Sequence, residues 1–410
     1  MTVINSLIDT DLYKFTMAQA VFHQFSKQRP ITRFKFKCRN ANNLAKYVDD
    51  INAEFDHLCT LGFQRNELDY LSSLTFLSQD FIDFLEMFRL KRNYIKCWID
   101  TNGELQIECD GPWIQVIFFE VFALSIVQEV WTMNEYPSHD MGFAREQLNL
   151  KIEDAKRHAT KLRFNFADFG TRRRFSYAWQ REVVQTLSSE LPRDVFTGTS
   201  NVLFAMEFGV KPIGTMAHEY LQAGQALGPR LVDSQKYMLE KWVQEYRGEL
   251  GIALSDVVGF DAFLVDFDKY FAKLYDGCRH DSGDPAKWCD KLIAHYVKLG
   301  IDPTTKTAVF SDGLDMASAM YLAERFRGRI NTSFGIGTNL TNDVGVDALQ
   351  VVMKMVECNG SPVAKISDSA GKGMCEDPEY LTYLKKVFKI PTVFDKMMVT
   401  GKKKYNVEVR

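Results

Sequence analysis

Residues 197–219 read TGTSNVLFAMEFGVKPIGTMAHE, and this stretch decides the fold. It contains a strand end with a Gly-Thr-Ser-Asn turn, a short apolar helix, and a second strand that closes with Gly214-Thr215-Met216. His218 and Glu219 follow directly. In a βα array the residues just past the strand ends meet at one edge, where ligands bind. An imidazole beside a carboxylate at that edge predicts a catalytic pair or a hydrogen-bonded structural histidine.

The same alternation of short apolar strands, polar turns and amphipathic helices runs from about residue 141 to residue 350. Strands followed by helices over this length predict a parallel βα sheet, most simply a closed barrel. Uneven spacing and extra helical turns favour an irregular barrel. The strand ends that carry this prediction are FADFG (166–170), VFTGTS (195–200), KPIGTMA (211–217), GIALSD (251–256), TAVFSDG (307–313) and INTSFGIGT (330–338).

The flanking segments have a different pattern. Residues 33–38 alternate with a period of two, and residues 94–99 and 105–109 predict a hairpin around Asn102-Gly103. Residues 41–57 and 78–89 are expected to be helical, and the apolar run 113–131 is expected to be a buried helix. The strand-like tail should rejoin the first domain. The fold class is therefore α/β, an irregular βα barrel with a second α+β domain, divided as 1–140 (N-terminal α+β domain), 141–350 (barrel with the active site) and 351–410 (C-terminal segment).

Length, charge and cysteine usage exclude several classes of protein. The 410 residues are enough for two domains. A net charge of −3 argues against non-specific nucleic-acid binding, which needs clustered excess Lys and Arg. Eight scattered cysteines without a CxxC pair indicate neither a zinc site nor a disulfide framework, so we expect a reduced, cytoplasmic setting. The N-terminus lacks an apolar signal region, and no membrane span is expected.

Five polar clusters carry the candidate chemistry. Glycine, serine and threonine at strand-to-helix turns direct backbone N–H groups to one side and favour anions. Arginines bind phosphate or carboxylate in a bidentate manner, and carboxylates suit ribose hydroxyls or Mg²⁺ held with phosphate oxygens. Together the clusters indicate an enzyme acting on a phosphorylated sugar, with a planar anionic ring as a further ligand. The clusters are 9–14, 168–174, 214–219, 279–284 with 311–315, and 334–339.

Each feature also has a purely structural interpretation at this point. Phe169 can be a core aromatic, Arg172 and Arg279 can form surface ion pairs, and Asp284 before Pro285 is a good helix cap. The Gly335-Ile336-Gly337-Thr338 turn can be a simple turn device.

The order of the motifs resembles nicotinate phosphoribosyltransferase along essentially the whole chain. This family joins nicotinate to phosphoribosyl pyrophosphate with the help of ATP. The motifs that carry the resemblance are DTDLYKFTM (9–17), DFGTRRRFS (168–176), FTGTSN (196–201), GTMAHE (214–219), RHDSGD (279–284), FSDGLD (310–315) and FGIGTNL (334–340).

The resemblance implies a type II phosphoribosyltransferase fold, a homodimer with shared active sites, and ATP and Mg²⁺ as co-substrate and cofactor. It implies nicotinate mononucleotide, pyrophosphate, ADP and phosphate as products, in the first step of NAD synthesis from nicotinate. His218 corresponds to the transiently phosphorylated histidine, and Glu219 is expected to orient its ring. Tyr13 corresponds to a tyrosine that the partner subunit supplies opposite Phe169. The other implied site residues are Arg172, Ser200, Arg279, Asp281, Asp312, Gly313, Gly335, Gly337 and Thr338, with no residue assigned to the metal.

Ser200 is the position that separates this family from its nicotinamide-using relative. The relative has an acidic residue after Gly-Thr, which accepts the amide N–H. An acid facing the nicotinate carboxylate would be repulsive, whereas a hydroxyl can donate a hydrogen bond. Ser200 therefore favours the acid substrate.

Three alternatives stay open at the level of sequence. The first is a phosphoribosyltransferase of this fold that uses nicotinamide or quinolinate. The second is a barrel isomerase or aldolase, which needs a Schiff-base lysine or a catalytic glutamate, with Lys211 and Lys365 as the candidates. The third is an inactive binding or assembly protein that keeps the fold.

Overall fold

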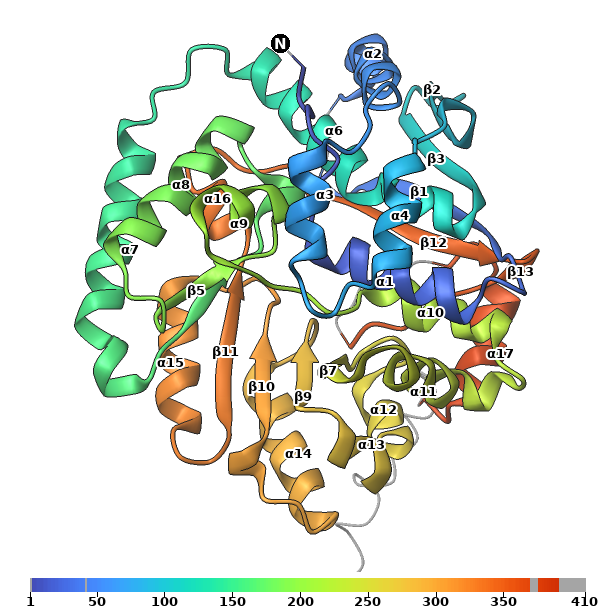
Figure 1. Ribbon diagram of the computed structural model, residues 1–410, viewed down its shortest axis with the longest axis vertical. Coiled ribbons are helices and arrows are strands. Elements are labelled where there is room, and N and C mark those ends of the chain that lie inside the picture. Colours follow the sequence, from blue (N-terminus) through green and yellow to red (C-terminus); the bar gives the residue numbers. More distant parts are fainter. Residues whose placement is uncertain (1, 41–42, 369–374, 391–410) are drawn as a thin grey trace, which may run out of the picture.

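The computed structural model describes residues 2–40, 43–368 and 375–390 and contains a parallel and an antiparallel sheet (Figure 1). The parallel sheet has the strand order β6-β5-β4-β11-β10-β9-β8. Six of its seven strands lie in the predicted strand-end segments, and β9 was not among the predicted strands. The α/β class is therefore confirmed. The seven strands are β4 (Phe166–Asp168), β5 (Phe196–Thr199), β6 (Lys211–Pro212), β8 (Ile252–Leu254), β9 (Gly277–His280), β10 (Thr307–Phe310) and β11 (Asn331–Ile336).

The sheet curls but does not close, because β6 and β8 form no ladder with each other. β6 is two residues long and ends at Pro212, which has no N–H to donate. A side chain spans the opening instead: Thr215 Oγ1 donates to the carbonyl oxygen of Ile252 at 2.9 Å. An irregular barrel is thus confirmed, and the simpler closed barrel is not formed.

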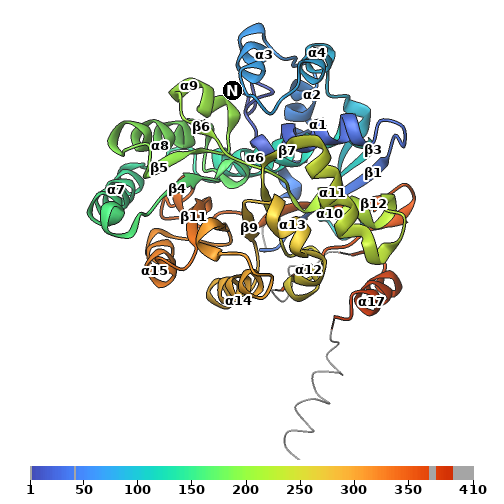
Figure 2. The same cartoon turned by 60° about the horizontal axis from the view of Figure 1, so that its bottom comes forward.

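Helices cover the outer face of the parallel sheet (Figure 2). Asp284 caps the N-terminus of the helix that begins at Pro285, since its Oδ1 accepts from the amides of Ala286 and Lys287 at 2.9 and 3.1 Å. The capping interpretation of Asp284 is correct. The helices of this domain are α7 (Gly142–Leu162), α8 (Tyr177–Glu190), α9 (Val202–Phe208), α10 (His218–Leu227), α11 (Ser234–Tyr246), α12 (Phe260–Asp266), α13 (Lys269–Leu274), α14 (Pro285–Lys298), α15 (Met316–Phe326) and α16 (Thr338–Thr341).

The antiparallel sheet joins the two ends of the chain. Its order is β13-β12-β1-β3-β2, so the orange β12 lies beside the blue β1 in Figure 1. The predicted strand, hairpin and returning tail are all present; residues 391–410 lie outside the described residues. The strands are β1 (Ile31–Cys38), β2 (Ile95–Ile99), β3 (Leu105–Pro112), β12 (Val351–Cys358) and β13 (Ser361–Pro362), and the short β7 (Arg247–Leu250) follows α11.

The remaining helices pack around this sheet and against the barrel. The apolar run near residue 113 forms one helical stretch, Trp113–Glu135, long and apolar enough to cross a membrane, yet 94% of its most apolar window is buried inside the protein. The elements are α1 (Leu12–Gln24), α2 (Val48–Leu58), α3 (Arg65–Ser72), α4 (Gln79–Met87), α5 (Trp113–Val116), α6 (Phe119–Glu135) and α17 (Pro378–Val387), with 3₁₀ turns η1 (Ala45–Tyr47), η2 (Arg92–Tyr94), η3 (Thr171–Arg173), η4 (Leu231–Asp233) and η5 (Pro303–Thr305).

The segment before α1 is fastened to the carboxyl edge of the parallel sheet. Arg174 is fully buried and donates to both carboxylate oxygens of Asp9 at 2.7 and 2.8 Å. The amide of Leu12 donates to the carbonyl oxygen of Ser200 at 2.8 Å. Because a buried bidentate pair of this kind is costly to break, α1 starts at a fixed place beside the strand ends.

Candidate functional site

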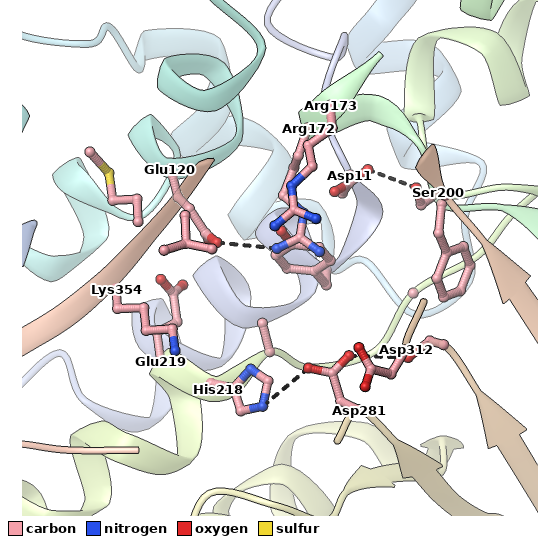
Figure 3. A pocket seen from close by; sticks show the side chains of 18 of the residues that line it. Asp11, Glu120, Arg172, Arg173, Ser200, His218, Glu219, Asp281, Asp312 and Lys354 are labelled. Carbon is pink, nitrogen blue, oxygen red and sulfur yellow. Dashed lines mark hydrogen bonds and ion pairs between the residues drawn. The ribbon is translucent and has the colours of Figure 1, made fainter. Parts of the chain in front are cut away.

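A cavity of about 400 Å³ lies between the carboxyl edge of the parallel sheet and the antiparallel sheet (Figure 3). Every predicted site residue except Gly335 lines it. Residues from α1, α6, β12 and the loop after β1 line it as well, so it is built by both sheets.

The turn after β4 is held by a buried carboxylate. Asp168 accepts hydrogen bonds from Thr199 Oγ1 (2.7 Å), Gln180 Nε2 (2.8 Å) and the Gly170 amide (2.8 Å). Burial raises the pKa of Asp168 to about 6, against the opposing effect of these bonds. The turn sends Phe169 and Arg172 into the cavity.

Gly335 has a different role from the one expected. It lies in β11, and a Cβ there would come within 2.3 Å of the Phe169 ring. Gly335 therefore leaves the space into which the Phe169 ring packs. Gly337 and Thr338 are the residues of this turn that line the cavity.

His218 begins α10 and faces two carboxylates. Its Nε2 lies 2.8 Å from Asp256 Oδ1. It also lies 3.4 Å from Asp281 Oδ2, and Figure 3 shows this second contact. Burial opposes ionisation of Asp256, but His218 and Lys365 outweigh it and hold its pKa well below the ordinary value. Burial, followed by the charge of Lys365, lowers the pKa of His218 and favours the neutral ring, whereas Asp256 and Asp281 oppose this shift. Because an ionised carboxylate only accepts, Nε2 carries the proton and Nδ1 has the lone pair.

The expected partnership between Glu219 and His218 is wrong. Glu219 Oε2 lies 3.1 Å from Lys14 Nζ, and Lys14 Nζ lies 2.6 Å from Glu120 Oε2. Successive residues of a helix point about 100° apart, so Glu219 faces away from the ring that precedes it. Burial is the largest cause that raises the pKa of Glu219 to about 7, and Glu120 adds to it.

The group His218, Asp256 and Asp281 has the composition of a cation site. Their ligand atoms lie within 4.8 Å of one another. Lys365 Nζ already lies 2.8 Å from Asp256 Oδ2 and 3.7 Å from Asp281 Oδ2. This ammonium supplies the positive charge that a resident metal would supply, so the group does not fit one.

His280, the other histidine of the clusters, does not line the cavity. It is buried, with its ring 5.3 Å from the Trp288 ring and 6.2 Å from the Phe310 ring. Burial lowers its pKa. The structure thus leaves His218 as the cavity's only histidine among the described residues.

Ser200 lines the cavity, but its proton is engaged. Ser200 Oγ donates to Asp11 Oδ1 at 2.7 Å (Figure 3). A hydroxyl has one proton, so Ser200 accepts rather than donates toward a ligand. The argument that Ser200 donates to a substrate carboxylate therefore needs correction, and Arg172, which also lines the cavity, is the group suited to that anion.

Tyr13 lines the cavity of its own chain, which differs from the expectation that a partner subunit supplies it. Its phenol oxygen is buried without a hydrogen-bond partner among the described residues. Burial and the charge of Glu120 raise its pKa well above the ordinary value. The anchoring of Asp9 and Leu12 explains the position, because Tyr13 lies on the first turn of the helix that these residues fix.

The wall opposite the barrel carries two cations, and a third comes from the turn after β4. Arg39 follows β1 and Lys354 lies in β12, and both line the cavity with Arg173. Burial first, then Lys365 and Arg39, lower the pKa of Lys354 to about 7. Burial, with Arg172 and Arg39, lowers the pKa of Arg173 to about 10. Several cations that line one cavity indicate a subsite for an anion of several charges.

Comparison with known proteins agrees with this geometry. The sequence model of the nicotinate phosphoribosyltransferase (NAPRTase) family matches residues 164–392, and that of its N-terminal domain matches residues 8–128. The chain belongs to the nicotinate phosphoribosyltransferase family. It is 53% identical over 390 residues to a nicotinate phosphoribosyltransferase of Xylella fastidiosa (94% of this chain, 98% of the relative). It is 52% identical over 398 residues to one of Acidovorax sp. (95% and 99%).

A solved structure shows the same fold. The crystal structure of a nicotinate phosphoribosyltransferase from Vibrio cholerae superposes with a TM-score of 0.91 at 39% identity, covering 98% of both chains. One from Porphyromonas gingivalis gives a TM-score of 0.88 at 32% identity, covering 95% of this chain and 100% of that one.

Sequence reasoning missed several residues of the site in this family member. Asp256 had a detectable signal, because GIALSD ends a strand with Ser-Asp as TAVFSDG does. No such signal marked Arg39, Glu120 and Lys354, because these residues come from a different domain and follow no polar turn of the barrel. Lys365 was considered only as a Schiff-base candidate, and its ion pair with Asp256 keeps it from that role.

Proposed function

We infer that the protein makes nicotinate mononucleotide and pyrophosphate from nicotinate and phosphoribosyl pyrophosphate, and that it couples this transfer to ATP hydrolysis through phosphorylated His218. The observation that carries the proposal is His218 itself: a neutral, Asp256-oriented imidazole at the strand ends, in one cavity with Phe169 and a cationic wall. Family membership supplies the substrates, as the related proteins are named for them.

The phosphoryl step follows from the tautomer of the ring. Nδ1 attacks the γ-phosphorus of ATP, the bond to the β–γ bridging oxygen breaks, and ADP leaves with that electron pair. Asp256 and Asp281 stabilise the positive charge that the ring gains, as an orienting carboxylate does for a nucleophilic or basic histidine. Water later attacks the phosphorus, which releases phosphate and returns the neutral ring.

The glycosyl step needs positioning and charge stabilisation. The pyridine nitrogen forms a bond to the anomeric carbon of phosphoribosyl pyrophosphate while the bond from that carbon to the pyrophosphate oxygen breaks. Phe169 and Tyr13 offer ring faces, and Arg172 offers a guanidinium for the nicotinate carboxylate. Arg39, Arg173 and Lys354 stabilise the leaving pyrophosphate.

Mg²⁺ accompanies both phosphate substrates in this proposal. Asp312 lines the cavity with carboxylate oxygens, the donors that this hard cation prefers, and it is the residue that would hold it, since Asp281 already faces His218 and Lys365. When bound it would neutralise charge on the phosphate oxygens.

The remaining expectations stay predictions. The homodimer is to be tested by sedimentation, and the cytoplasmic setting agrees with eight cysteines that are all free thiols. A Schiff-base isomerase or aldolase is disfavoured, because Lys211 is exposed and lies outside the cavity lining and Lys365 is ion-paired.

Incubation with γ-labelled ATP tests the proposal. We expect an acid-labile, base-stable label on the peptide that contains His218, discharged faster when nicotinate and phosphoribosyl pyrophosphate are added. His218→Asn should lose the label and the ATPase activity and keep a slow, ATP-independent transfer. A label on the His280 peptide, or full ATP-coupled activity in His218→Asn, would contradict the proposal.

A further inference from the structure

A fully buried lysine ties three elements of the cavity together. The Lys14 side chain has 0% exposure and forms ion pairs with Glu120 and Glu219 at 2.6 and 3.1 Å. Each of the three residues adjoins a residue that faces the ligands. Lys14 follows Tyr13 on α1, Glu219 follows His218 on α10, and Glu120 Oε1 on α6 lies 3.6 Å from Arg172 Nη1 (Figure 3).

We propose that Lys14 is a positioning residue that links the ring-binding side of the cavity, Tyr13 and Arg172, to His218, so that phosphorylation of His218 changes the affinity for nicotinate. This inference rests on the proposed ATP coupling. Lys14 touches no substrate itself, because it is buried beneath the cavity and does not line it.

Stability alone gives a weak account of this cluster. Moving an ammonium and two carboxylates out of water costs more than their attraction returns in many proteins, and apolar side chains of similar size are often at least as stable. One ammonium also serves two carboxyl groups, and burial raises the pKa of Glu219 to about 7, so this group is only partly ionised near pH 7. Such a cluster responds to charge placed nearby, and a phosphoryl group on His218 adds that charge one residue from Glu219.

Two buried oxygen atoms in and beside the cluster lack hydrogen-bond partners among the described residues. Glu219 Oε1 is buried with no hydrogen-bond partner among the described residues, and so is the phenol oxygen of Tyr13. A buried polar atom without a partner is costly, so both atoms favour any rearrangement or ligand that satisfies them. Lys14 lies between them in the chain of contacts, because it adjoins Tyr13 and binds Glu219.

The measurement is the factor by which ATP lowers the KM for nicotinate. Sites linked through a protein commonly change each other's affinity by roughly 5- to 150-fold. For the wild-type chain we expect a factor within this range, and for Lys14→Met a factor near one. Lys14→Met should still form the phosphoprotein and still transfer slowly without ATP, because the contacts of His218 with Asp256 and Asp281 remain.

Lys306→Met is the matched control. Lys306 is also a buried lysine, but its ammonium binds the carbonyl oxygen of Tyr275 at 2.6 Å, and it does not line the cavity. It should keep the wild-type factor. Where Lys14→Met fails to fold, Glu219→Gln replaces it, since it keeps an oxygen for Lys14 and removes one charge, and it should reduce the factor to an intermediate value.

Each outcome decides the question. A wild-type factor that persists in folded Lys14→Met, or in Glu219→Gln where that variant takes its place, overturns the positioning role and leaves the proposed function intact. A wild-type chain with no ATP effect and no phosphoprotein overturns the proposed function, and the linking role of Lys14 with it. A fall in apparent kcat in step with the loss of folded protein, with every KM and the factor unchanged, shows a structural role only.

Discussion

The two walls of the cavity were not equally readable in the sequence. The barrel wall consists of residues that follow strand ends, such as Phe169, His218 and Asp281, and every one of them lay in a quoted motif. The opposite wall consists of Arg39, Lys354 and Glu120, which come from a strand end, a strand and a helix of the other domain. The comparison shows that a βα sequence pattern predicts only those site residues that follow the strands of the parallel sheet. Site residues that come from the other domain can be identified only when the packing of the two domains is known.

Asp256→Asn gives the largest expected effect on the barrel wall. The carboxylate fixes the tautomer of His218 and stabilises its positive form, and an amide does neither. We expect the rate of phosphoprotein formation to fall on the order of a hundredfold or more, as loss of an orienting carboxylate does elsewhere. Rapid quench with labelled ATP measures it.

Asp284→Asn is the control for this substitution. Asp284 caps α14 outside the cavity, and asparagine caps helices about as well as aspartate. The control should phosphorylate at the wild-type rate. An Asp256→Asn protein as fast as the control would show that Asp281 alone orients the ring.

The difference between the walls also explains which site predictions failed. Glu219 was assigned to His218 because the two are adjacent in sequence, but adjacent residues of a helix diverge, and the partner came from the end of β8. The fold was predictable because strand periodicity, the Asn-Gly hairpin and the Asp-Pro helix start are local signals. Which sheet edge faces which helix depends on long-range packing, so Lys14 and Glu120 could not be paired from the sequence.

Ser200→Asp tests the role of charge at the cavity residue that contacts the N-terminal segment. A carboxylate there would lie against Asp11 in a buried place, near the proposed nicotinate carboxylate. We expect the KM for nicotinate to rise on the order of tenfold or more, since like charges in a partly dry site repel by about 1.4 kcal/mol or more. Steady-state kinetics with nicotinate and nicotinamide measures it.

Ser200→Ala separates charge from the lost hydrogen bond. It removes the donor to Asp11 without adding a charge, so its KM should change only a few-fold. Equal effects of the two substitutions would show that the hydroxyl, and not the charge at this position, controls nicotinate binding.

Lys354 gives a smaller effect that depends on pH. Its pKa is lowered to about 7 by burial and by Lys365 and Arg39, while Asp256 and Asp281 oppose the shift. Below pH 7 the ammonium form of Lys354 predominates. Each pH unit above the pKa lowers the fraction of free enzyme that carries this ammonium about tenfold. The KM for phosphoribosyl pyrophosphate should therefore rise from pH 7 to pH 8 by at most about tenfold.

Lys354→Arg sharpens this test, because a guanidinium stays charged throughout this range. Its KM should be flat between pH 7 and pH 8, whereas Lys354→Met should be flat and higher. Calorimetry with pyrophosphate in two buffers should show proton uptake by the wild-type chain near pH 8 and little by Lys354→Arg. An unchanged pH profile in Lys354→Arg would assign the titration to another group.

Subunit mixing should give the smallest effect, which is none. Tyr13 and His218 line the same cavity of one chain, and Asp9 and Leu12 hold α1 to the barrel of that chain. Tyr13→Ala removes a ring face and His218→Asn removes the proposed nucleophile, so a mixture of the two variants contains no cavity with both residues, whatever the oligomer. ATP-coupled synthesis should not recover after co-expression or after mild unfolding and refolding together. Recovery, with hybrid particles confirmed by differently tagged chains, would show that Tyr13 reaches into a partner's cavity and that α1 leaves the position seen here.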